Sequence, residues 1–314
     1  MNKIANRQIM CETLLEQAKK NNDLLVLTSD SRGSASLLPF AEQLPTQLIE
    51  TGIAEQNIVG MAAGLAHSGK RPFVASPACF LSMRSIEQIK VDVAYSNTNV
   101  KLIGISGGVS YGALGMSHHS LQDIAVTRAI PNLEVIIPAD RFETKAVFNY
   151  LAESDKPAYV RLGRNPVEDC YSEELTSFEV GKAVTMQDGR DLTLIATGET
   201  VRVALDAALA LEQQGLSVRV LNIHTIKPLD QQAIIKAAQE TKLVMTLEEH
   251  SIYSGLGAAV AEVISAIPQS APVKILGIAD EPAITGKTKE IFEHYGLSVE
   301  NIKQIVTDYF RKNG

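Results

Sequence analysis

The sequence predicts two three-layer α/β domains, each built on a mostly parallel sheet that is covered by helices. Short apolar runs alternate with segments of helical periodicity along nearly all of the 314 residues, and this alternation is typical of parallel strands joined by helices. The rhythm is broken once, in an acidic stretch that contains Pro166, Glu168 and Asp169. We therefore expect a first domain over residues 1–166, a linker over 167–180 and a second domain over 181–314.

Most elements of the first domain follow from apolar periodicity. A short strand at Gln47–Glu50 precedes a helix from Ile58 to His67 that is rich in alanine and glycine. Helical patterns also fall at Ile86–Tyr95 and Leu121–Ala129. Short apolar runs predict the other strands, which we place at Leu24–Thr28, Phe73–Ser76, Lys101–Ser106, Glu134–Pro138 and Ala158–Leu162.

The second domain resumes the same alternation after the linker. Helices are predicted between its strands, which again favours parallel pairing. The strands are expected at Leu192–Ala196, Val218–Ile223, Leu243–Leu247 and Val273–Ile278.

The composition excludes several classes of partner. A formal net charge of -7 argues against a nucleic-acid backbone or an anionic membrane as a partner. Three widely spaced cysteines without a C-x-x-C pair indicate a reducing compartment, with no structural disulfide and no zinc site. The N-terminus lacks the apolar stretch of a signal peptide, and no run of about 18 apolar residues occurs. We expect a cytoplasmic protein without a membrane anchor.

Glu55 is the strongest candidate for chemistry. It lies between the strand that ends at Glu50 and the following helix, where open α/β sheets bind their ligands. Small residues at 62–64 let this helix pack closely and leave the carboxyl little water. A carboxyl so placed tends to keep its proton and can donate it to a ring nitrogen. The alternative is an acid in the first turn of a helix, which the helix dipole favours.

Three other features are candidates for a site. In the run Cys79–Gln88, Phe80, Met83 and Ile86 share one helical face, for which core packing is the default interpretation. A helix beginning near Ser117, after a glycine-rich loop, would place His118 and His119 about 100° apart, so they could not bind one metal ion. A histidine suits proton transfer, although His118 could instead cap its own helix. Arg164 follows the last strand of the first domain, where a guanidinium suits a bidentate phosphate contact.

These motifs resemble the transketolase family of thiamine-diphosphate enzymes, and the resemblance covers nearly the whole chain. Gly52-Ile53-Ala54-Glu55 matches the motif whose glutamate hydrogen-bonds the aminopyrimidine ring of the cofactor. The resemblance implies that Phe80 stacks on that ring, while Met83 and Ile86 stand where some members carry further aromatic residues. It also implies that His118 lines the substrate channel and assists proton transfers, as the histidine of the G-x-T-H motif does. The two domains would then be a pyrimidine-binding domain and a transketolase C-terminal domain.

The resemblance also bears on the substrate. Arg164 matches the arginine that binds the terminal phosphate of the sugar, and Ser34 aligns with a serine that contacts the same phosphate. Leu114 stands where many transketolases have an aspartate that reads a sugar hydroxyl, and Ser106 stands where they have a phosphate-contacting histidine. We therefore expect a donor unlike the usual pentose phosphates, for example a branched ketose phosphate such as apulose 4-phosphate.

Half of the expected cofactor site is missing from the sequence. The family holds the diphosphate through Mg²⁺ bound by a G-D-G motif, which does not occur in this chain, and nothing else supplies an octahedral set of oxygen ligands. We expect no metal ligand here. The resemblance implies a separate diphosphate-binding transketolase subunit that carries the Mg²⁺ ligands, in a heterotetramer of two copies of each chain.

Several related functions compete with a split transketolase that moves a two-carbon ketol unit between sugar phosphates. Deoxyxylulose-phosphate synthase shares the A-E-Q form of the motif around Glu55, and the beta chain of the 2-oxo acid dehydrogenases has the same size and domain order. From another class, the chain could be a non-catalytic binding subunit. The retention of Glu55, Phe80 and His118 together argues against that last possibility.

Overall fold

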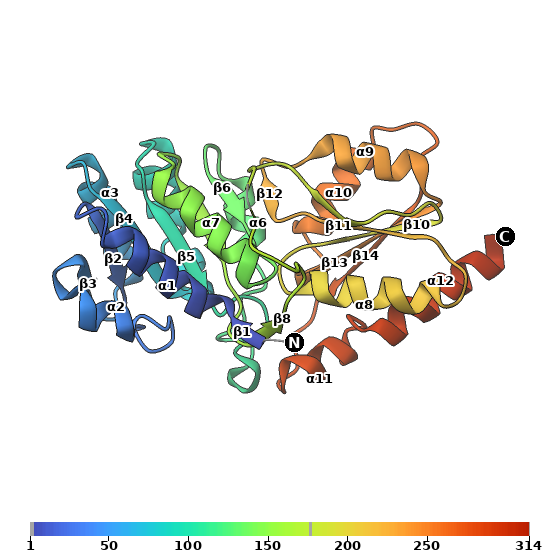
Figure 1. Ribbon diagram of the computed structural model, residues 1–314, viewed down its shortest axis with the longest axis horizontal. Coiled ribbons are helices and arrows are strands. Elements are labelled where there is room, and N and C mark those ends of the chain that lie inside the picture. The colour runs from blue at the N-terminus through green and yellow to red at the C-terminus, as the bar shows by residue number, and fades with distance from the viewer. Residues whose placement is uncertain (1–2, 176–177, 314) are drawn as a thin grey trace.

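The computed structural model describes residues 3–175 and 178–313. Two large sheets lie side by side, and helices cover both faces of each (Figure 1). This arrangement confirms two α/β domains with mostly parallel sheets. In the described part of the chain, no helix has both the length and the hydropathy needed to cross a bilayer.

The first sheet has seven strands in the order β12-β6-β7-β5-β4-β2-β3. Its neighbours are parallel, except that β12 runs antiparallel to β6. The six parallel strands lie where the apolar runs predicted them. They are β2 (Leu24–Thr28), β3 (Leu48–Glu50), β4 (Arg71–Pro77), β5 (Lys101–Ile105), β6 (Glu134–Ile136) and β7 (Ala158–Arg161).

Each face of this sheet has its own apolar core, because successive residues of a strand point to opposite faces. Leu27 and Val74 pack on one face, and Val26 and Phe73 on the other. The second face is covered by α1 (Asn6–Ala18), α2 (Leu38–Gln43) and α7 (Arg141–Glu153). The first is covered by α3 (Glu55–His67), α4 (Ala78–Arg84), α5 (Ile86–Gln88), the π-helical segment η2 (Ile89–Tyr95) and α6 (Asp123–Ala129).

The second sheet has five strands in the order β14-β13-β10-β11-β9, and only β9 is antiparallel to its neighbour. Helices α9 and α10 lie on one face, and α8 and α12 on the other (Figure 1). The strands are β9 (Val184–Gln187), β10 (Leu192–Ala196), β11 (Val218–Asn222), β13 (Leu243–Ser251) and β14 (Val273–Ile278). The helices are α8 (Thr200–Glu212), α9 (Gln231–Glu240), α10 (Leu256–Ile264), α11 (Thr288–His294) and α12 (Val299–Asn313).

Three strands of three residues each tie distant parts of the chain together. Strand β1 (Lys3–Ala5) pairs antiparallel with β8 (Pro166–Glu168), which lies at the start of the expected linker. Strand β12 (Thr225–Lys227) comes from the second half of the chain but extends the first sheet at β6. The first sheet therefore contains one strand from beyond the linker, so a division at the linker does not fully separate the two sheets. The domain boundaries stay a prediction.

The glycine-rich loop differs from the prediction. No helix begins near Ser117: the loop contains a short 3₁₀ turn, η3 (Gly112–Leu114), residues 116–118 form a turn, and α6 begins only at Asp123. The loop is fastened to the second sheet, since the backbone N–H of Val109 donates to Oε1 of Glu249 at 2.8 Å. That contact helps to fix the segment that carries His118.

Candidate active site

Glu55 begins helix α3, beyond the end of strand β3, and its side chain is only 4% exposed. The turn before it needs a left-handed backbone at Gly52, with φ of +70°, which glycine adopts without strain. The carboxylate accepts a hydrogen bond from Nη1 of Arg84 at 3.0 Å. A carboxylate buried this deeply needs such a partner, because the loss of its hydration would otherwise be costly.

Arg84 also contacts Phe80, so it joins two of the predicted cofactor-binding residues. Its guanidinium carbon lies 4.0 Å from the centre of the half-buried Phe80 ring, in a cation–π arrangement. Both residues lie on α4, one turn apart. Met83 on the same helix is 49% exposed, whereas Ile86 on α5 is partly buried against the core. Glu55 and Phe80 are therefore brought together through Arg84, which the sequence did not single out.

His118 lies against Phe80 and not with its neighbour His119. The His118 ring is 5.2 Å from the Phe80 ring and 5.5 Å from the Tyr111 ring, edge-to-face in both cases. Its Nδ1 lies 3.0 Å from Oγ of Ser117. His119 is buried, with Nε2 at 3.0 Å from the carbonyl oxygen of Gly112, and burial lowers its pKa. The two histidines therefore face different surroundings, although they lie in a turn and not on the predicted helix.

Arg164 belongs to a cationic cluster with Arg7. The Arg164 guanidinium carbon is 5.1 Å from the centre of the Tyr111 ring. Arg7 donates from Nε to the carbonyl oxygen of Arg164 at 3.1 Å and from Nη1 to the carbonyl oxygen of Ser34 at 2.6 Å. Burial and the neighbouring charge of Arg164 lower the pKa of Arg7. Two guanidinium groups held this close form a site suited to an anion.

One donor of this cluster is left unused. Nη1 of Arg164 is buried and has no hydrogen-bond partner in residues 3–175 and 178–313. A buried cationic donor without a partner is costly, so an anion placed there would be stabilised. Arg7 was missed because nothing near it in the sequence marks it. Its contact with Arg164 is made across 157 residues of the chain, and its contact with Ser34 across 27.

Leu114 lies on the turn η3, three residues after Tyr111, and its side chain is 53% exposed. Met116, beyond it in the same loop, is 59% exposed. The loop thus presents apolar groups to solvent at the place where the family has an aspartate.

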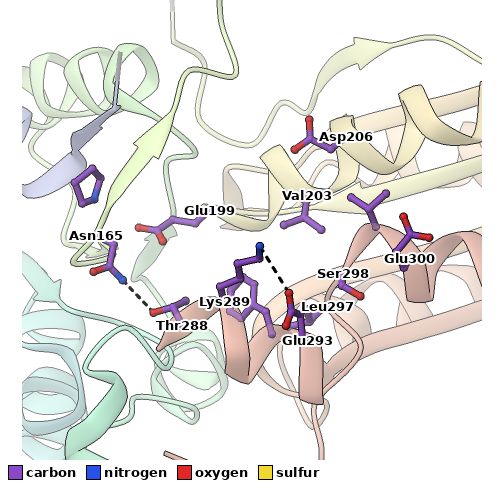
Figure 2. A pocket seen from close by; sticks show the side chains of 13 residues that line it. Asn165, Glu199, Val203, Asp206, Thr288, Lys289, Glu293, Leu297, Ser298 and Glu300 are labelled. Carbon is purple, nitrogen blue, oxygen red and sulfur yellow. Dashed lines mark hydrogen bonds and ion pairs between the residues drawn. The ribbon is translucent and has the colours of Figure 1, made fainter. Parts of the chain in front are cut away.

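One large cavity lies away from these residues. It has a volume of about 690 Å³ and is lined by α8, α11 and the start of α12 together with Asn165 and Pro166 (Figure 2). Across its inner end, Nδ2 of Asn165 donates to Oγ1 of Thr288 at 3.0 Å (Figure 2). None of the predicted site residues lines it.

Several large apolar side chains are exposed on or near the elements that carry Glu55, Phe80 and Arg84. They lie before or on α3, on α4 and on η2, which pack against one another. Monomeric proteins seldom expose such a group of large apolar side chains unless it binds something. We call this group the apolar patch: Ile53, Met61, Met83, Val91 and Tyr95.

The fold places the candidate site beyond the carboxyl ends of parallel strands, where open α/β sheets bind ligands. A buried carboxyl and an aromatic ring lie there, both in contact with Arg84. In the described ranges, no group of three His, Cys, Asp or Glu side chains lies close enough to hold a metal ion.

Comparison with known proteins gives the family. Residues 2–168 match the model of the transketolase pyrimidine binding domain, and residues 181–302 that of the transketolase C-terminal domain. The chain is 50% identical to a subunit of the apulose-4-phosphate transketolase of Phocaeicola vulgatus, over 99% of both chains. A 1-deoxy-D-xylulose-5-phosphate synthase of Heliobacterium modesticaldum is 34% identical, but only 46% of that enzyme is covered.

A solved structure described as a split gene transketolase, an inactive beta4 tetramer, matches with a TM-score of 0.86 and 35% identity, over 98% of both chains. The chain belongs to the transketolase family. It corresponds over its length to a transketolase subunit that carries the pyrimidine-binding and C-terminal domains.

Proposed function

We propose that this chain supplies the pyrimidine-binding half of the active site in a two-chain transketolase, which moves a two-carbon ketol unit from a ketose phosphate to an aldose acceptor. The observation that carries the proposal is that the buried carboxyl of Glu55 and the aromatic face of Phe80 both contact Arg84. The similarity to the Phocaeicola vulgatus transketolase subunit over the whole chain supports it.

The residues of the site fit the aminopyrimidine ring of thiamine diphosphate. Phe80 offers a face for stacking, with Met83 and Ile86 beside it, and Glu55 can share a proton with a ring nitrogen in a place that excludes water. When bound, the cofactor supplies the nucleophilic carbon that takes up the ketol unit. Arg84 contacts both of the groups, Glu55 and Phe80, that the ring needs. With 48% of its side chain exposed, it can turn outward as the ring enters.

His118 is the proposed proton-transfer residue on the substrate side. It touches both Phe80 and Tyr111, and Tyr111 contacts Arg164, so His118 connects the ring site with the Arg7–Arg164 cluster. A histidine there can take a proton from a sugar hydroxyl and return it.

The remaining half of the site is assigned to a separate N-terminal, diphosphate-binding subunit that carries the Mg²⁺ ligands. The apolar patch supports this, since it borders Glu55 and Arg84 and is free to be covered by a partner. We propose a heterotetramer of two copies of each chain. A reducing cytoplasm suits the three unpaired cysteines of the chain.

The proposed donor is a ketose phosphate that differs from the common pentose phosphates. Arg164 and Arg7, with Ser34 beside them, bind the phosphate. Leu114 cannot accept a hydrogen bond from a sugar hydroxyl, so the donor either lacks that hydroxyl or fills the apolar space with a carbon branch. The name of the Phocaeicola vulgatus relative supports apulose 4-phosphate, a branched sugar.

Two rival activities use the same pyrimidine contacts. Deoxyxylulose-phosphate synthase and the 2-oxo acid dehydrogenases both act on a 2-oxo acid, which carries no terminal phosphate. The synthase also takes up a phosphorylated aldehyde, so the Arg7–Arg164 cluster argues only against the dehydrogenases. The synthase of Heliobacterium modesticaldum matches at lower identity and over less than half of its length. The transketolase is therefore favoured.

Isothermal titration tests the division of the cofactor site. The isolated chain should bind thiamine diphosphate poorly and turn over no sugar, and addition of the diphosphate-binding subunit with Mg²⁺ should restore both. Micromolar affinity of the isolated chain for the cofactor would overturn the two-chain proposal. A panel of apulose 4-phosphate, xylulose 5-phosphate and fructose 6-phosphate then tests the donor: if xylulose 5-phosphate is best, Leu114 does not set specificity.

A further inference from the structure

Tyr111 lies beside two residues of the proposed substrate site. Its ring packs edge-to-face with the His118 ring, at 5.5 Å between ring centres. The guanidinium carbon of Arg164 lies over the Tyr111 ring, 5.1 Å from its centre. A sugar phosphate that contacts both His118 and Arg164 therefore lies close to this ring.

The Tyr111 ring is held, but its hydroxyl is not. The following residue, Gly112, has φ of +52°, and a Cβ there would lie 2.5 Å from the backbone oxygen of Gly286. The turn is thus closely packed against the second domain. The Tyr111 hydroxyl makes no hydrogen bond to any residue within 3–175 or 178–313. Tyr111 borders a cavity of about 670 Å³, which is also lined by Asn165, the neighbour of Arg164, and by residues 286–290 of the second domain. A fixed phenol with a free hydroxyl at the wall of a cavity is well placed to bind a ligand oxygen.

We propose that Tyr111 is a specificity-determining residue whose hydroxyl hydrogen-bonds the donor sugar between the bond that breaks and the phosphate ester. This inference rests on the proposed function. The position three residues later, Leu114, lacks the oxygen that could have made such a contact. The phenol therefore supplies the polar contact from the other end of the same turn. Unlike a carboxylate, a phenol can donate to an ether or carbonyl oxygen as well as accept from a hydroxyl.

The test uses the enzyme assembled with its diphosphate-binding partner chain and compares Tyr111→Phe with wild type. Phenylalanine keeps the ring contacts with His118 and Arg164 and removes only the hydroxyl. The donors are apulose 4-phosphate, xylulose 5-phosphate and fructose 6-phosphate. Hydroxypyruvate serves as a ketol donor with neither a further hydroxyl nor a phosphate. The matched control is Tyr253→Phe, since Tyr253 is 58% exposed and far along the chain from the site.

We expect Tyr111→Phe to lower kcat/KM for the best ketose phosphate by roughly 5- to 50-fold and to leave hydroxypyruvate turnover unchanged. Inhibition by inorganic phosphate should also be unchanged, which separates the role of Tyr111 from that of Arg164. An equal loss of kcat/KM for hydroxypyruvate and the sugar phosphates, or no loss for any of them, would overturn the role of Tyr111 and leave the proposed function standing. A wild-type enzyme that accepts hydroxypyruvate but no ketose phosphate would refute the proposed donor class and this role together.

Discussion

At the scale of single residues, the Glu55 carboxylate is almost fully buried and is neutralised by one flexible arginine. In the assembled enzyme, Glu55→Gln should lower turnover by about 10²–10⁴-fold, the usual effect of removing a positioned proton-transfer group. Proton–deuterium exchange at the thiazolium carbon of bound thiamine diphosphate measures this step directly. Glutamine keeps the size of the side chain, so the variant should fold as wild type does, and a loss of turnover then reports the loss of the carboxyl group. Exchange at the wild-type rate would show that Glu55 does not activate the cofactor.

Arg164 offers a second residue-scale prediction. Arg164→Ala removes a charge-assisted contact worth about 1.5–3 kcal/mol, so kcat/KM for phosphorylated donors should fall by roughly 10- to 150-fold. Hydroxypyruvate turnover should hardly change. Steady-state kinetics with both kinds of donor, and inhibition by inorganic phosphate, decide the point. If kcat/KM falls equally for phosphorylated donors and for hydroxypyruvate, the cationic cluster supports the fold and does not bind phosphate.

Residues with a local sequence signal could be predicted, and residues that act through tertiary contacts could not. Glu55, Phe80 and His118 each stand in a recognisable motif, and the structure places Phe80 against His118. Arg84 and Arg7 carry no such signal, because an arginine on a helix is ordinarily solvent-exposed. Only the tertiary contacts show that these two guanidinium groups face the site: Arg84 on α4 contacts Glu55 on α3, and Arg7 on α1 contacts the backbone of Arg164.

At the scale of elements, the start of helix α7 forms hydrogen bonds with both the linker and the second sheet. Asp140 caps the helix by accepting from the backbone N–H groups of Phe142 and Glu143, and its other oxygen accepts from the N–H groups of Cys170 and Tyr171. Glu143, fully buried in the first turn, accepts hydrogen bonds from Asn222 on β11 and from the hydroxyl of Tyr171. The first turn of α7 thus holds the first domain, the linker and strand β11 together.

This arrangement predicts a pH-dependent stability. Burial raises the pKa of Glu143 to about 7, above its ordinary value. The folded state therefore binds a proton that the unfolded state releases, so the associated stability is present below about pH 4.5 and is lost as the pH rises through 7. Relative to Glu143→Gln, the free energy of unfolding of wild type should fall by about 1–3 kcal/mol between pH 4.5 and pH 8. Urea unfolding of both proteins across this range measures it, and parallel curves would contradict it.

Elements differed in how well they could be predicted, and their place in the strand–helix alternation was the reason. The buried strands of the two sheets appear as apolar runs, and their register leaves both faces buried. Strands β1, β8 and β12 contain three residues each and lie outside that alternation. Strands β3 and β6 are equally short, but they stand within it and were predicted. The helix predicted near Ser117 was wrong because the glycine-rich loop is fixed by contacts with Glu249 and Gly286, which lie more than a hundred residues away.

At the scale of the whole molecule, the apolar patch predicts where the diphosphate-binding partner chain docks. Tyr95→Asp should weaken association with that chain by about 10- to 100-fold, as expected for an aromatic residue at an interface. Because 86% of the Tyr95 side chain is exposed, the isolated chain should remain as stable as wild type. Sedimentation of the mixed chains gives the affinity, with Tyr253→Asp as the control. If both substitutions change the affinity equally, the apolar patch is not part of the interface.

Strand β12 determines how the chain responds to being cut. It leaves the second domain to close the edge of the first sheet at Val135 and Ile136, and an uncovered strand edge recruits other chains. A protease that nicks the linker of the folded protein should therefore release nothing, because both fragments stay joined through this strand. If the two fragments were made from separate genes, the first fragment would fold with the edge of β6 exposed until the second fragment bound to it. Dividing this gene at the linker would produce aggregates, not two modules.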